Sequence, residues 1–189
     1  MSARVLGEST QALQKSLARL SSGSKLNNAS DDAAGAAVSL KLDSQISRLN
    51  SAKSNVGNAI SFSQTQDGYL KKVGTALDRM GELAVLAQDT TKSSTDLALY
   101  DKEFQKLATF IDDTASKKFN DVALFSATGI KVTQDEDGTA YTMSAVDLGA
   151  AGGKYKLATA TDVTDTTKAA AALTAVKNAV TQLASDRAD

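Results

Sequence analysis

The feature that most restricts the fold is one apolar frame that continues from about Asp32 to about Thr90. Its members are separated by three or four residues or by sums of such steps: Leu42, Ile46, Leu49, Val56, Ile60, Leu70 and Leu77. The apolar stripe continues at Met80, Leu83, Ala84 and Ala87. This spacing predicts one long, coiled-coil-like helix. At about 1.5 Å per residue it would be roughly 85 Å long, too long for a compact domain of this size, so other helices must lie beside it.

The chain contains no proline. A proline inside a helix costs about 3 kcal/mol, so its absence fits a chain made mainly of long helices.

Three other segments repeat the helical spacing. An N-terminal one runs from Val5 to Leu20 and ends at the Ser21–Ser24 cluster, after which Ser30, Asp31 and Asp32 are expected to cap the long helix. A second, from Leu97 to Ile111, follows a polar turn and is predicted to fold back antiparallel on the long helix. The third covers Ala169 to Leu183, with Thr164 and Asp165 as expected N-caps. Together they predict a mostly α fold.

The segment from Gly129 to Gly153 changes to strand spacing. Ile130 and Val132 alternate with polar residues, Asp135–Gly138 has the composition of a turn, and Tyr141 and Met143 alternate again. This pattern predicts a β-hairpin. A glycine-rich break at Gly149–Gly153 follows, and Lys154–Ala158 is expected to form a further short strand.

The composition lacks the side chains on which most catalytic and metal sites depend. The chain has no Cys, no His and no Trp, so thiolate nucleophiles and the commonest metal ligand and general base are missing. We therefore expect no catalytic residues, no metal, no cofactor and no enzymatic activity. With 21 basic and 22 acidic side chains the formal charge is -1, which disfavours nucleic-acid binding, and no apolar run is long enough to insert into a membrane.

Four segments resemble one known family, the bacterial flagellins. Residues 20–35 read LSSGSKLNNASDDAAG, which is similar to the N-terminal signature of that family in order and length. Three shorter matches follow in the expected order: Glu82–Val85, Phe119–Phe125 and Leu183–Asp186. The resemblance covers nearly the whole chain, and the hairpin region matches least well.

The resemblance implies an elongated bundle of long antiparallel helices, two N-terminal and one C-terminal, with a small β-hairpin on its flank. The expected parts are an N-terminal helical region (1–128), a hairpin region (129–160) and a C-terminal helix of the same rod (161–189). The implied function is a structural subunit of the flagellar filament, which serves motility and lies outside the cell after export without a cleaved signal peptide. Family members carry longer terminal coiled-coil segments, so this chain is expected to be a truncated core that does not polymerise.

The resemblance also implies partners and sites. Other flagellin subunits, a flagellar export chaperone and a flagellin-sensing Toll-like receptor are the expected partners. Hairpin residues Ile130, Val132, Tyr141 and Met143 are candidates for a subunit contact, with packing of the hairpin on its own helices as the alternative. Receptor contact is expected at Arg79, Glu82, Leu83 and Glu103, although Gly81 stands where strongly sensed relatives carry arginine. The alternative is that Arg79 and Glu103 form an exposed ion pair or a solvated face and that Leu83 packs inside the helical bundle.

Two other functions remain open at this point. A hook-filament junction protein is similar to flagellin at both ends. A cell-surface adhesin or polysaccharide-binding module could use the same scaffold, although sugars usually stack on exposed aromatic rings and only 5% of these residues are aromatic.

Overall fold

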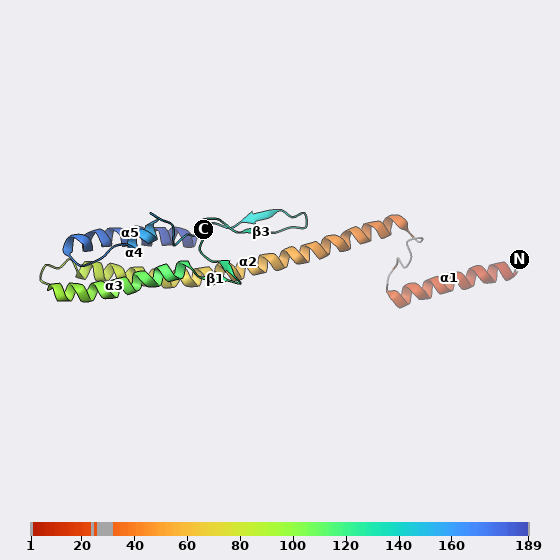
Figure 1. The fold of residues 1–189 in the computed structure, drawn as a ribbon. Coiled ribbons are helices and arrows are strands. Elements are labelled where there is room, and N and C mark those ends of the chain that lie inside the picture. The colour runs from red at the N-terminus through yellow and green to blue at the C-terminus, as the bar shows by residue number, and fades with distance from the viewer. Residues whose placement is uncertain (1, 24, 26–31, 189) are drawn as a thin grey trace. The chain divides into compact units, whose positions relative to one another are not determined.

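The computed structural model describes residues 2–23, 25 and 32–188, and most of them are helical. The five helices of this part of the chain are α1 (Ser2–Ser22), α2 (Ala33–Leu86), α3 (Ser94–Ala115), α4 (Lys154–Thr159) and α5 (Thr166–Ala188) (Figure 1). The prediction of a mostly α chain with one very long helix is therefore confirmed. The chain divides into two compact units, which are described separately.

The N-terminal unit contains the residues up to Ala52 together with Asp135–Asp137. It holds α1 and the first part of α2. The carboxylate of Asp32 accepts a hydrogen bond from the backbone N–H of Gly35 at 2.9 Å, so Asp32 caps α2 as expected. Ser30 and Asp31, the other expected capping residues, lie outside the described residues.

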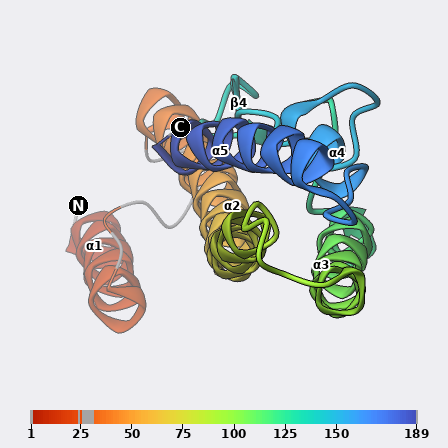
Figure 2. The same cartoon turned by 90° about the vertical axis from the view of Figure 1, so that its left-hand side faces the viewer.

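The second unit, which we call the bundle unit, contains residues 53–134 and the residues from Gly138 onward. Here α5 runs antiparallel to α2. Arg187 bonds to Asp67, Leu183 lies against Gly74 and Val176 lies against Gly81, so residue numbers rise along one helix as they fall along the other. A short connection brings α3 back beside α2, as predicted, and the end view in Figure 2 shows α5 lying across this pair.

Small side chains let the helices approach closely. Ala169, Ala172 and Ala179 of α5 are completely buried, and they alternate with the buried side chains of Val176 and Leu183. Leu77, Met80, Phe104 and Ile111 supply the bulky part of the same core, with no measurable exposure to solvent. Asp165, an expected N-cap, accepts a hydrogen bond from the backbone N–H of Lys168 at 2.8 Å and so begins α5.

The expected strand at Lys154–Ala158 is wrong, because this segment forms helix α4. Tyr155 and Leu157 alternate with lysines and mimic a strand, but the buried residues Tyr155, Ala158 and Thr159 have helical spacing. The helix fits between its neighbours: Tyr155 Oη donates to Asp186 of α5 and Lys156 Nζ donates to Asp112 of α3, both at 2.7 Å. Contacts with both helices therefore outweighed the local pattern.

Two small antiparallel strand pairs complete the bundle unit: β1 (Lys118–Phe119) with β2 (Val122–Ala123), and β3 (Lys131–Thr133) with β4 (Ala140–Thr142). The second pair is the predicted hairpin, with Val132 opposite Tyr141. The first was not predicted, and its turn places Asn120 and Asp121 at φ values of 49° and 64°, which short polar side chains tolerate. Gly129 at the base of the second hairpin is obligatory, because a Cβ there would lie 2.1 Å from the carbonyl oxygen of Met143.

Candidate functional site

Helix α1 exposes the apolar face that its sequence builds. None of its residues is buried, and Leu20 is 82% exposed. The other large apolar side chains on α1 are also in solvent: Val5, Leu6, Leu13 and Leu17. Burying one leucine side chain contributes about 1.5–3 kcal/mol to the free energy of folding or binding. A partner that covers this face would therefore gain a large amount of binding free energy.

The first part of α2 has the same property. Val38, Leu42, Ile46 and Leu49 are exposed apolar residues. We call these four residues, together with the five exposed apolar residues of α1, the N-terminal stripe. Exposed large apolar side chains gathered on one face of a helix mark an interaction site in soluble proteins.

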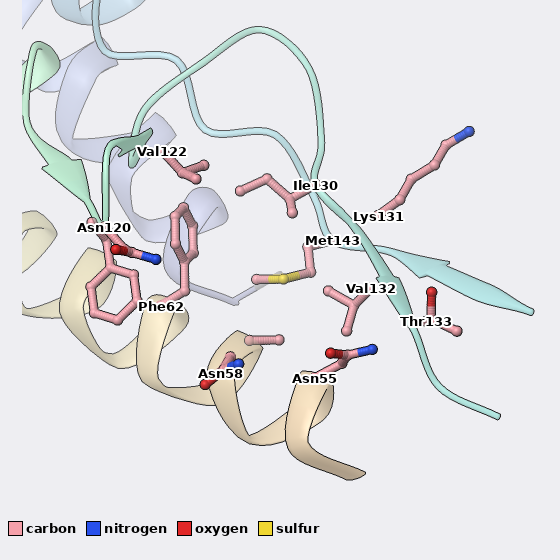
Figure 3. Close-up of a pocket in the computed structure, with 12 residues that line it drawn as sticks. Asn55, Asn58, Phe62, Asn120, Val122, Ile130, Lys131, Val132, Thr133 and Met143 are labelled. Atoms are coloured by element: carbon pink, nitrogen blue, oxygen red, sulfur yellow. The ribbon is translucent and has the colours of Figure 1, made fainter. Parts of the chain in front are cut away.

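A groove lies beside the hairpin in the bundle unit, with a volume of about 550 Å³ (Figure 3). Helix α2 contributes Asn55, Asn58, Ala59 and Phe62, and the rest of the lining comes from both strand pairs and their ends: Phe119, Asn120, Val122, Ile130, Lys131, Val132, Thr133 and Met143. The rings of Phe62 and Phe119 meet edge to face, with 5.9 Å between their centroids. Their contact fixes the β1–β2 turn against α2.

The four hairpin residues predicted for subunit contact lie in two different environments. Ile130, Val132 and Met143 are half-buried and line the groove, and Ile130 and Met143 also pack against the core. Tyr141 is 56% exposed and lines two neighbouring hollows instead. Packing of the hairpin on the chain's own helices thus explains part of the alternation of apolar residues in these strands. The subunit contact itself stays a prediction.

Three of the four residues predicted for receptor contact form one charged cluster. Arg79 Nε donates to Glu103 Oε1 at 2.7 Å, its Nη2 to Glu103 Oε2 at 3.2 Å and its Nη1 to Glu82 Oε2 at 2.8 Å. The hydrogen bond from Arg79 lowers the pKa of Glu103, and the bonds to Glu103 and then Glu82 raise the pKa of Arg79. The guanidinium of Arg79 therefore links α2 to α3 through a bidentate ion pair with Glu103.

Leu83, the fourth of these residues, has no exposed surface and packs in the core. A partner that approaches the folded chain would touch Arg79, Glu82 and Glu103 but not the side chain of Leu83. The receptor contact stays a prediction for Arg79 and Glu82, which are exposed, and for Glu103, which is half-buried.

Sequence reasoning missed most of the groove. Asn55 and Asn58 are three residues apart, which places them on one face of α2, but nothing local indicates that a hairpin lies over that face. For Lys131 and Thr133 the alternating pattern indicates only the polar half of a strand. Phe119, Asn120 and Val122 belong to a family-like motif, but that motif does not reveal their contact with Phe62.

Among the described helices, none is both long and apolar enough to span a membrane. In the same residues, acidic side chains nowhere form a group of three suited to holding a metal ion.

Comparison with known proteins gives a family match over most of the chain. Residues 2–130 match the family model of the bacterial flagellin N-terminal helical region. The chain is 39% identical over 131 residues to the flagellar filament 31.3 kDa core protein of Treponema maltophilum, covering 69% of this chain and 46% of that protein. It is 31% identical to the flagellar filament 30.7 kDa core protein of the same organism, covering 98% of this chain and 71% of that protein.

The fold has a similar solved structure. The crystal structure of Bacillus cereus flagellin superposes with a TM-score of 0.58 at 28% identity, covering 70% of this chain and 77% of that one. Against several sequence relatives, including the 31.3 kDa protein of Treponema maltophilum and the 33 kDa protein of Treponema phagedenis, the match spans about half of the relative's length.

Proposed function

This chain belongs to the bacterial flagellin family, and from that membership we propose that it is a structural subunit of the bacterial flagellar filament. The observation that carries the proposal is the N-terminal stripe, whose apolar residues lie in solvent along α1 and the first part of α2. A chain that functioned alone would gain nothing from leaving these side chains uncovered. The named relatives are filament proteins, and none of them is a junction protein or an adhesin.

A filament assembles when one surface of each subunit binds a different surface of its neighbour. Such a contact does not close into a ring, so it repeats along a helical lattice and builds a filament. The N-terminal stripe supplies apolar area for this contact. Of the hairpin candidates, Tyr141 presents an exposed side chain and Val132 a half-buried one, whereas Ile130 and Met143 pack against the core and contribute by holding the hairpin in place.

The remaining partners follow from the same membership. The filament lies outside the bacterial cell, so the chain would have to be exported. We propose that export proceeds without a cleaved signal peptide and with the help of a flagellar export chaperone. Recognition by a Toll-like receptor would use the cluster of Arg79, Glu82 and Glu103. The N-terminal stripe would let the purified chain bind at a filament end, where it competes with the bacterium's own filament protein for that end.

Competition with filament growth tests this proposal. Sheared filament seeds from the bacterium that makes the protein would be elongated with that bacterium's own filament protein, with and without an excess of the purified chain. We expect the chain to bind growing ends and slow elongation, measured by light scattering and electron microscopy. Leu42→Asp should abolish the effect, because it places a charge in the N-terminal stripe.

Ser51→Asp is the matched control, since it adds the same charge on the polar side of the same helix. Elongation that is equally fast with and without the wild-type chain would contradict the proposed role. Equal inhibition by Leu42→Asp and Ser51→Asp would remove the N-terminal stripe from the mechanism.

A further inference from the structure

Strand β3 pairs with β4 along one edge, and no other described strand pairs with its second edge, which we call the free edge. The backbone N–H of Met143 bonds to the carbonyl of Ile130 at 2.8 Å, and that of Gln134 bonds to the carbonyl of Thr139 at 2.9 Å. With Val132 opposite Tyr141, residues 130, 132 and 134 direct their backbone groups toward β4. Lys131 and Thr133 therefore direct their N–H and C=O groups away from β4, along the free edge.

The groove described above borders this free edge. All three residues of β3 line it, whereas no residue of β4 does. Figure 3 shows Ile130, Val132 and Met143 around an apolar hollow that Phe62 and Val122 close on the opposite side. The site thus combines unpaired backbone groups with an apolar floor, which are the two parts that strand addition requires.

Three amide side chains border the same groove. Asn55 and Asn58 come from α2 and Asn120 from the β1–β2 turn, and all three are exposed. None of these side chains makes a hydrogen bond to another residue in the part of the chain that the structure describes. Each amide both donates and accepts, so it can bind either polar group of a second backbone.

The charge among the described lining residues of the groove is positive. Of the described residues that line it, Lys131 alone is charged, and its side chain extends outward from β3 in Figure 3. Val132 has the opposite orientation in the strand and faces the groove beside α2. An added strand would therefore place an apolar side chain opposite Val132 and an acidic one beside Lys131.

We propose that this groove binds an extended peptide segment of another protein, which adds as a strand to the free edge of β3. The segment carries an apolar residue with an acidic neighbour, and its backbone pairs with Lys131 and Thr133. The three asparagine amides bind the far side of its backbone. No residue of the N-terminal stripe contributes to this site, so peptide binding can fail without affecting the filament-end test, although Val132 is shared with the proposed subunit contact.

A synthetic peptide tests the proposal: acetyl-Ser-Thr-Val-Glu-Val-Ser-amide, titrated into the intact chain and followed by NMR. We expect shifts at the amide protons of Lys131 and Thr133, slower exchange of both, and shifts of the three asparagine side chains. The peptide that is N-methylated at Thr and Glu keeps its side chains but loses the donors that face β3, so its binding should be lost.

Charge exchange supplies a second readout. Lys131→Glu should weaken binding of the glutamate peptide about fivefold and favour a peptide with Lys in place of Glu, as expected for an exposed ion pair. Lys177→Glu, an exposed site on α5, should leave both affinities unchanged. Circular dichroism checks that both variants fold.

Four results of the peptide titrations would overturn the proposal: no binding at millimolar peptide, equal binding of the N-methylated peptide, equal affinity of the wild type and Lys131→Glu for the glutamate peptide, or shifts confined to α1. Concentration-dependent broadening at Lys131 and Thr133 without peptide would identify a second copy of this chain as the occupant, and would also overturn it.

Discussion

Leu42 and Leu77 occupy one apolar frame of the same helix, yet Leu42 is 51% exposed and Leu77 is completely buried. The difference is in what covers them. In the bundle unit α3 and α5 lie against α2, whereas among the described residues of the N-terminal unit no helix buries the face that carries Leu42. An apolar frame thus specifies which face of a helix seeks a partner, but not whether that partner belongs to the same chain.

The largest effect should come from truncating these two leucines. Leu77→Ala removes a side chain from a closed core and should destabilise the bundle unit by about 3 kcal/mol, whereas Leu42→Ala should change its stability by no more than about 0.5 kcal/mol. Urea unfolding followed by tyrosine fluorescence measures this, because Tyr69, Tyr100, Tyr141 and Tyr155 all lie in the bundle unit. Similar losses for the two variants would show that the N-terminal stripe is covered in solution.

The same comparison explains what sequence could reveal about the fold. The four long helices were predictable because each carries an apolar face over many turns, and the Asp32 and Asp165 caps are local features. Helix α4 was not predictable. Six residues span fewer than two turns, and the bonds of Tyr155 and Lys156 to distant helices decide their conformation.

The sites show the same limit. The pairing of Arg79 with Glu103 joins residues 24 positions apart, and the family resemblance pointed to both. Burial of Leu83 agrees with its place in the apolar frame, whereas the family resemblance indicated a surface contact there. The groove depends on Phe62 meeting Phe119 and on the hairpin lying over Asn55 and Asn58, which are tertiary contacts without a local signal.

Glycines of α2 sharpen the contrast between covered and open faces. A Cβ at Gly68 would meet no atom within 4 Å, whereas one at Gly74 would lie 3.1 Å from Leu183 Cδ2. Gly68→Ala should therefore stabilise the bundle unit by up to about 1 kcal/mol through helix propensity, while in Gly74→Ala displacement of Leu183 offsets that gain. Thermal unfolding of both variants gives the difference, and Gly57→Ala, also in open space, is the control. Equal stabilisation at positions 68 and 74 would mean that α5 packs loosely on α2.

The smallest effect concerns the ion pair that fastens the end of α5 to α2. Hydrogen bonds from Lys71 and then Arg187 lower the pKa of Asp67, at N–O distances of 2.9 and 2.8 Å. Because the folded pKa lies below the unfolded one, the contribution is complete above the unfolded pKa of about 3.9 and is lost as the pH falls through the folded value.

About 40% of the Asp67 side chain is exposed, so solvent screening limits the contribution to about 0.5 kcal/mol. We expect the wild-type chain to lose this much more stability than Asp67→Asn between about pH 5 and pH 2, measured by urea midpoints across that range. Arg187→Gln, which leaves Asp67 its bond to Lys71, should fall between the two. If Asp67→Asn follows the pH dependence of the wild type, the pair does not hold α5 in solution, and α5 is fastened there by Leu183 and its apolar neighbours alone.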